Sequence, residues 1–326
     1  MSSSSKTRDY LFDNYKALLI FLVVIGHFVG PSSTDNSFLM ILKWLIVSFH
    51  MPAFIFISGY FSKKDLSIRT QIQRLAIPYL IFEIVYYLWY TLFLHKSTEL
   101  ALLKPKFTLW YLLALFLWRL ITPYVKKIPH YMILAVAAGF LIGFSNMENN
   151  FLTIPRALVY YPFYLAGTVF DREWLNRHRS NADKRNAVLC IGIIFVFLFL
   201  IGTQKAAPMQ IFYGRYNYSS MKQSVFTGLF WRCILYLVGF LMTFSVMILM
   251  SEKKLPFSYI GTRTMAIYLF HGLTYKAIET TLLTDITGIF ETFLLLAGCA
   301  ALTLLFSWKP FTVLTGSASK IPFPKS

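Results

Sequence analysis

The sequence contains few charged residues. Only 14% of its 326 residues are charged, 57% are hydrophobic, and the mean hydropathy is +0.58; an average soluble domain has roughly 25% charged residues. Several segments of about 20 residues contain almost no charged residue. A helix of that length crosses the hydrocarbon core of a bilayer. This composition excludes a water-soluble fold and predicts a polytopic, all-α membrane protein.

Acidic residues are scarce, with 14 Asp and Glu against 31 Lys and Arg, a net charge of +17. A protein that binds nucleic acid gathers its basic residues on a soluble face. Here they lie between apolar segments instead. We therefore expect contact with membrane lipid and no nucleic-acid partner.

Cysteine is nearly absent. Cys190, Cys233 and Cys299 all fall within apolar runs, and their spacing matches neither a metal site nor a disulfide framework. We expect no metal.

The polar N-terminus is not followed by a small-residue cleavage site, so we expect the first apolar run to remain as an uncleaved span.

Windows of about 19 residues predict ten membrane spans, with the N-terminus in the cytoplasm. With this topology 20 of the Lys and Arg residues lie in cytoplasmic segments and 7 in outer ones, as the positive-inside rule requires, which puts both termini in the cytoplasm. No loop is long enough for a soluble domain, so we expect one membrane domain over 1–326. The predicted spans are 14–31, 38–61, 75–94, 107–124, 129–145, 155–171, 187–203, 224–250, 257–280 and 287–308.

The first span contains a lysine and a histidine on one face. Lys16 and His27 are eleven residues apart, so a helix brings them to within about 20° of each other and separates them by roughly 16 Å along its axis. Intramembrane ionisable groups are functional candidates. The alternative is that His27 is a packing residue, hydrogen-bonded to a neighbouring helix.

The second and third spans add further candidates. His50 precedes Pro52, which leaves a backbone carbonyl without its helical donor, so His50 either orients a substrate or caps that carbonyl. Ser58 marks a narrow helix surface. Arg69 and Arg74 are expected at the cytoplasmic end of the third span, where they either bind phosphate or are simply solvated.

Aromatic residues and a late histidine complete the set of candidates. Trp110 and Tyr111 begin the fourth span, where they either anchor the helix at the interface or stack on a sugar. Tyr268 and His271 are three residues apart in the ninth span and share a helix face. We expect this pair to line a substrate path.

Five motifs together resemble the membrane-bound acyltransferase family 3, and in particular its short members related to fucose 4-O-acetylase. They are Lys-x10-His in the first span, FHMPAFIFISGYF in the second, RTQIQRLAIPYL entering the third, LWYLLAL in the fourth and GTRTMAIYLFH in the ninth. The resemblance spans nearly the whole chain and is most specific in 13–80.

The resemblance implies an enzyme that transfers an acetyl group from cytoplasmic acetyl-coenzyme A to a hydroxyl of a glycan. The acceptor would be a capsule, an exopolysaccharide or a lipid-linked sugar, at the plasma membrane of a bacterium. His27 matches the family's essential histidine, Lys16 its basic residue, Arg69 and Arg74 its third-span arginines, and His271 its late histidine.

The chemistry of the transfer fits these assignments. The phosphates of coenzyme A suit a cluster of Lys and Arg, and a sugar hydroxyl needs a base such as His27 to accept its proton. An acetyl-histidine intermediate is the other route, although direct transfer needs fewer states.

A carrier or flippase for a sugar or lipid-linked sugar is the alternative function. Against it, the sequence shows no internal repeat and no matched pair of broken helices of the kind found in many transporters. The acceptor sugar, the hydroxyl modified, the size of the acyl group, the side of transfer and the oligomeric state stay open.

Overall fold

The structure is a computed structural model that describes residues 8–64, 66–147 and 150–318. Within these ranges the chain is helical and contains no β-strand. The α-helices are α1 (Tyr10–Phe28), α2 (Ser37–Tyr60), α3 (Ile68–Gln71), α4 (Ile77–Leu88), α5 (Trp110–Val125), α6 (Tyr131–Leu141), α7 (Ile154–Val169), α8 (Arg172–Arg177), α9 (Asn181–Thr203), α10 (Val225–Leu249), α11 (Thr264–Ile278), α12 (Ile289–Phe306) and α13 (Lys309–Ala318).

A helix occupies each of the ten predicted spans, and an all-α membrane bundle is confirmed. Among the described residues, seven helices are long and apolar enough to cross a bilayer. The third of these is continuous over Ile68–Phe93, because π-helical turns join α3 to α4 and extend α4. The helices at Tyr131–Phe144, Ile154–Val169 and Thr264–Ile278 are shorter, so the count of ten crossings and the position of the termini stay predictions.

Polar residues just before the helices explain where several of them begin. Asp9 accepts a hydrogen bond from the backbone N–H of Leu11, and Asn36 accepts one from that of Leu39. Such N-caps satisfy donors that have no partner inside the helix. α1 and α2 therefore start at defined positions.

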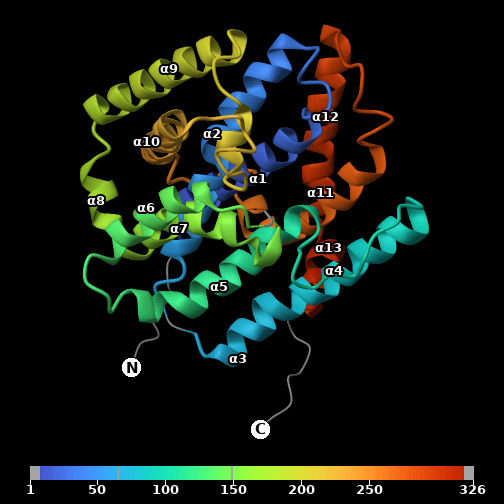
Figure 1. Ribbon diagram of the computed structural model, residues 1–326, viewed down its shortest axis with the longest axis horizontal. Coiled ribbons are helices and arrows are strands. Elements are labelled where there is room, and N and C mark those ends of the chain that lie inside the picture. Colours follow the sequence, from blue (N-terminus) through green and yellow to red (C-terminus); the bar gives the residue numbers. More distant parts are fainter. Residues whose placement is uncertain (1–7, 65, 148–149, 319–326) are drawn as a thin grey trace.

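α1 and α2 lie in the interior, surrounded by the other helices (Figure 1). α2 packs against α7, α10 and α9, and α1 packs against α2, α11 and α12. Large apolar side chains are instead exposed on the peripheral helices, for example Ile193 on α9 and Ile289 on α12. In a membrane protein such apolar surfaces face the lipid tails, while α1 and α2 fill the interior of the bundle.

Two glycines allow α2 and α7 to cross closely. A Cβ on Gly59 would meet the backbone of Tyr164, and a Cβ on Gly167 would meet the backbone of Phe56. Small residues permit this close approach in membrane bundles, where packing rather than water drives association. The narrow surface predicted beside Ser58 is thus the contact with α7.

A buried ion pair fixes the segment that enters α5. Glu83 is fully buried and accepts hydrogen bonds from both the backbone N–H (3.0 Å) and the Nζ (3.2 Å) of Lys106. On the other side of Phe107, Tyr268 donates its hydroxyl hydrogen to the carbonyl of Thr108. Phe107 itself has a φ of 43°, which is unusual for an aromatic residue and requires such support.

Candidate active site

His27 lies in the last turn of α1 and is only partly buried. Its ring lies 4.8 Å from that of Phe107, 5.4 Å from that of His271 and 5.8 Å from that of Tyr275, measured between ring centroids. Phe107 and Tyr275 stack on each other at 5.0 Å. Residues separated by up to 248 positions in sequence therefore form one aromatic site around a single imidazole.

The other two intramembrane histidines are oriented by their own helices. His50 Nδ1 lies 2.6 Å from the carbonyl of Ile46, and His271 Nδ1 lies 3.0 Å from that of Ile267. A carbonyl only accepts, so Nδ1 donates in both rings and leaves Nε2 as the acceptor of the neutral imidazole. His50 thus binds the Ile46 carbonyl, not that of Ser48, which is the one that Pro52 leaves without a donor.

Four cavities follow one another past His27. From the predicted outer side to the predicted cytoplasmic side, we call them the outer cavity (about 410 Å³), the passage (about 20 Å³), the inner cavity (about 220 Å³) and the basic cavity (about 430 Å³). His27, Met51 and Trp110 line both the outer cavity and the passage. This shared lining places His27 at the junction of a wide outer space and a narrow one.

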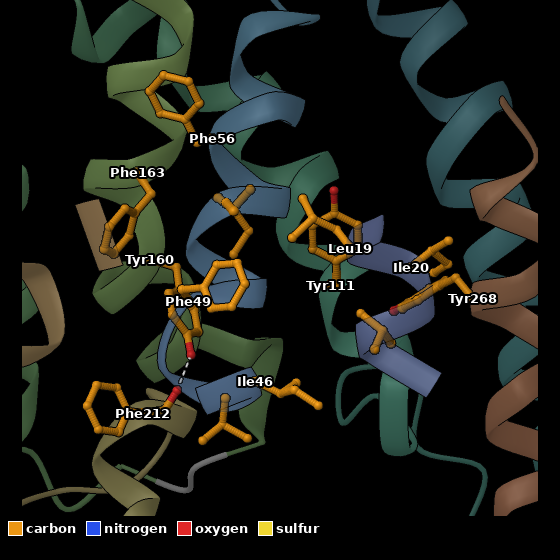
Figure 2. Close-up of a cluster of buried hydrophobic side chains, with 14 of the residues drawn as sticks. Leu19, Ile20, Ile46, Phe49, Phe56, Tyr111, Tyr160, Phe163, Phe212 and Tyr268 are labelled. Carbon is orange, nitrogen blue, oxygen red and sulfur yellow. Dashed lines mark hydrogen bonds between the residues drawn. The ribbon is translucent and has the colours of Figure 1, made fainter. Parts of the chain in front are cut away.

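Three aromatic residues separate the passage from the inner cavity. Phe54, Tyr111 and Tyr268 line both spaces, and Figure 2 shows the two tyrosines close to Leu19 and Ile20 of α1. The Tyr111 hydroxyl lies 2.5 Å from that of Ser58. Tyr111 is therefore a buried residue of the path, while His271, fully buried, reaches that path through its contact with the His27 ring.

Lys16 lines the inner cavity, below His27 on the same helix, as the one-face prediction requires. Its Nζ pairs with Asp13 at 3.0 Å. The inner cavity joins the basic cavity through Ser62 and Arg119, whose guanidinium donates to the Ser62 hydroxyl at 2.8 Å. The basic cavity is also lined by four lysines: Lys63, Lys64, Lys126 and Lys127.

Arg69 and Arg74 are placed differently from the lysines. Both are exposed, on α3 and the π-helical turn that follows, and neither lines the four cavities. Arg119 of α5 lines both the inner and the basic cavity instead. The role of Arg69 and Arg74 in binding a donor stays a prediction.

The outer cavity contains residues that sequence reasoning did not select. Four cations line it: Lys43, Arg156, Arg215 and Lys276. Lys43 and Lys276 fall inside predicted spans, so the rule that selected His27 applies to them as well. Arg156 stands at the outer end of the predicted span 155–171 and Arg215 in a predicted outer segment. Only the tertiary fold brings these two residues together.

Aromatic residues surround these cations. Trp110 stacks near Tyr160 at 5.8 Å, and the guanidinium of Arg156 lies 4.7 Å from the centre of the Trp110 ring. The hydroxyl of Tyr160 in turn donates a hydrogen bond to the carbonyl of Phe212, as Figure 2 shows. Tyr213 and Tyr216 also line the cavity. Trp110 is thus part of the cavity wall next to the passage.

Comparison with known proteins agrees with the resemblance seen in the motifs. A nodulation protein, NolL of Sinorhizobium fredii (strain NBRC 101917 / NGR234), is 30% identical over 189 residues, covering 52% of this chain. The match spans only 50% of that relative's length. No solved structure matches the chain significantly.

The family profile covers far more of the chain than this relative does. The profile described as an acyltransferase domain, of the acyltransferase 3 type, matches residues 9–310, from the start of α1 to α13. That range includes every helix that lines the four cavities. The chain therefore belongs to this family of acyltransferases and is a multi-pass membrane protein.

Proposed function

We propose that this membrane acyltransferase uses acetyl-coenzyme A from the cytoplasm to O-acetylate a cell-surface or exported glycan, with His27 as the general base. The observation that carries the proposal is the position of His27 between cavities on two predicted sides of the membrane. Acyl transfer between a cytoplasmic donor and an extracytoplasmic acceptor needs a site that both can reach. We place the enzyme in the plasma membrane of a bacterium.

The donor would enter from the cytoplasmic side. Arg119, Lys16 and the four lysines of the basic cavity offer cations to its phosphates. The thin pantetheine arm would then run through the inner cavity toward the passage. Opening of the contact between Tyr111 and Tyr268 would admit the thioester to His27.

The reaction itself needs one proton acceptor and one proton donor. As the sugar hydroxyl attacks the thioester carbonyl, His27 accepts the hydroxyl proton, and an ester bond forms while the carbon–sulfur bond breaks. The histidine then returns the proton to the departing thiolate of coenzyme A. A positioned base of this kind contributes typically 10² to 10⁴ in rate.

The carrier function is less well supported. A carrier needs a route that a sugar can traverse, whereas the passage beside His27 has a volume of only about 20 Å³. Cations at fixed positions on both sides of this constriction suit binding of a donor and an acceptor.

Release of free coenzyme A by purified protein, with and without a surface-glycan extract of its host, tests the proposal. We expect glycan-dependent release by wild type, and a loss of 10² to 10⁴ in rate in His27→Asn. The matched control is His95→Asn, because His95 is exposed and outside the cavities. Equal rates in His27→Asn and wild type, or no glycan-dependent release by wild type, would refute the proposal.

A further inference from the structure

The outer cavity is a cationic site within an apolar protein. Among the residues that the structure describes, Lys43, Arg156, Arg215 and Lys276 line it, and no Asp or Glu does. Lys276 is neutralised by Glu279, with Nζ–O distances of 2.8 and 3.0 Å. The other three cations have no carboxylate within ion-pair distance in the described part of the chain.

The two arginines also have unused hydrogen-bond donors. The Nε atoms of Arg156 and Arg215 are buried and have no partner among the described residues. The guanidinium of Arg156 lies over the face of Trp110, and that of Arg215 contacts the ring and hydroxyl of Tyr216. Lys43 reaches only uncharged oxygens, the carbonyl of Gly30 at 3.4 Å and the hydroxyl of Ser33 at 3.3 Å.

Three cations that line one cavity with no carboxylate partner among the described residues are costly to the folded state. Buried charges in such proteins are rare and are paired or lie in a functional path. A guanidinium offers a fork of donors that matches the two oxygens of a carboxylate or phosphate. The missing partner for Arg156 and Arg215 therefore has the chemistry of an anion.

The walls of the cavity indicate what carries that anion. Trp110, Tyr160, Tyr213, Tyr216 and Tyr275 line the same space, and flat aromatic faces with a polar edge suit a ligand that is partly apolar and partly hydroxylated, such as a sugar ring. Trp110 joins the cations to the transfer site, because it lines the passage with His27 and lies under Arg156.

From this geometry we propose that the acceptor is an anionic carbohydrate, bearing a carboxylate or phosphate close to the hydroxyl that is acetylated. This inference rests on the proposed function. Arg156 and Arg215 bind the anion, Lys43 adds to the positive field, and the aromatic walls hold the ring with its hydroxyl toward His27. With the donor bound as proposed, the phosphates of coenzyme A would be separated from this site by the passage and would meet the cations of the basic cavity.

A binding experiment that does not depend on turnover tests the proposal. Purified protein in detergent is titrated with matched sugars, namely glucose, glucuronate and glucose 1-phosphate and the same three forms of galactose, with inorganic pyrophosphate as a probe of the anion alone. Thermal stability reports binding. Arg156→Gln and Arg215→Gln remove a charge, Arg156→Lys retains it, and Lys205→Gln, at an exposed outer-segment lysine, is the control.

We expect the charged probes to bind more tightly than their neutral partners. Each Arg→Gln change should weaken the charged probes by roughly tenfold, the loss of about 1.4 kcal/mol, and leave neutral sugars unaffected. Arg156→Lys should retain part of the binding, and Lys205→Gln all of it. Added salt should weaken only the charged probes.

Other outcomes would overturn the inference. Equal binding of charged and neutral sugars, or no binding of any anionic probe at millimolar concentration, would show that the cations do not select an anion. A weaker affinity for acetyl-coenzyme A in Arg156→Gln, with sugar binding unchanged, would assign the outer cavity to the donor. His27→Asn should still bind the charged probes, so failure of the proposed base and failure of the anion site give different results.

Discussion

At the scale of single residues, His27 depends on a neighbour that lies 244 positions later in the chain. The Nε2 of His271 is buried, has no partner among the described residues, and belongs to a ring 5.4 Å from that of His27. If His27 is the general base, as proposed, its imidazolium carries two N–H groups once it has taken the proton of the acceptor. One of them would face the substrate and the other would have His271 Nε2 available as an acceptor.

We therefore expect His271→Phe to lower kcat by roughly 10²-fold, the order of loss that a misplaced reacting group causes, with little change in KM. His271→Gln, whose side-chain oxygen also accepts, should retain more of the rate. Steady-state kinetics on coenzyme A release measures both. Equal losses of kcat in the Phe and Gln variants would argue that His271 only fills space.

At the scale of elements, the segment that carries Phe107 to His27 is held by the ion pair of Glu83 and Lys106. Breaking a buried pair from one side leaves the other charge unpaired, at a cost of about 3–5 kcal/mol. We expect Glu83→Gln to destabilise the protein by this order, as measured by denaturant unfolding in detergent. Lys106→Met alone should be comparably destabilising.

The double variant Glu83→Gln/Lys106→Met distinguishes the pair from the two residues taken separately. If the single losses come from an uncompensated charge, the double variant should lose much less than their sum. Arg177→Gln is the matched control, because its pair with Asp171 spans 3.6 Å between exposed side chains and is worth at most about 1 kcal/mol. Additive losses in the double variant would mean that the ion pair does not hold this segment.

At the scale of the whole molecule, the two-sided arrangement of cavities requires the predicted topology. Cysteine labelling can test it, because the chain has only Cys190, Cys233 and Cys299, none of them in a disulfide. In a variant with these three changed to alanine, we expect a membrane-impermeant maleimide to label Lys205→Cys in intact cells and Lys64→Cys only after lysis. Both side chains are exposed, so access decides the result.

The reverse labelling pattern would mean that the predicted orientation is inverted and that the outer cavity opens toward the cytoplasm. Labelling of both positions in intact cells would contradict an odd number of crossings between residues 64 and 205. The prediction has five spans there, and three of the described helices between these residues are long and apolar enough to cross a bilayer, at Ile68–Phe93, Phe107–Val125 and Asn181–Thr203.

The membrane bundle, a helix in each of the ten predicted spans and the position of Lys16 below His27 could be predicted from the sequence. These follow from hydropathy and from the 3.6-residue period of a helix, which are local properties of the chain. The same reasoning predicted that Tyr268 and His271 share a helix face and line a substrate path, and that Tyr111 either anchors its helix at the interface or stacks on a sugar. It did not place them relative to His27.

Which groups meet at the site could not be predicted from the sequence, because it depends on how distant segments pack. Segments far apart in the sequence meet in three places. His27 contacts His271, Arg119 lies between two cavities, and Lys43, Arg156 and Arg215 line one cavity together. No period within one helix encodes such contacts. They depend on how the helices cross, and those crossings are set by close packing such as that of Gly59 against α7, and by buried pairs such as Glu83 with Lys106.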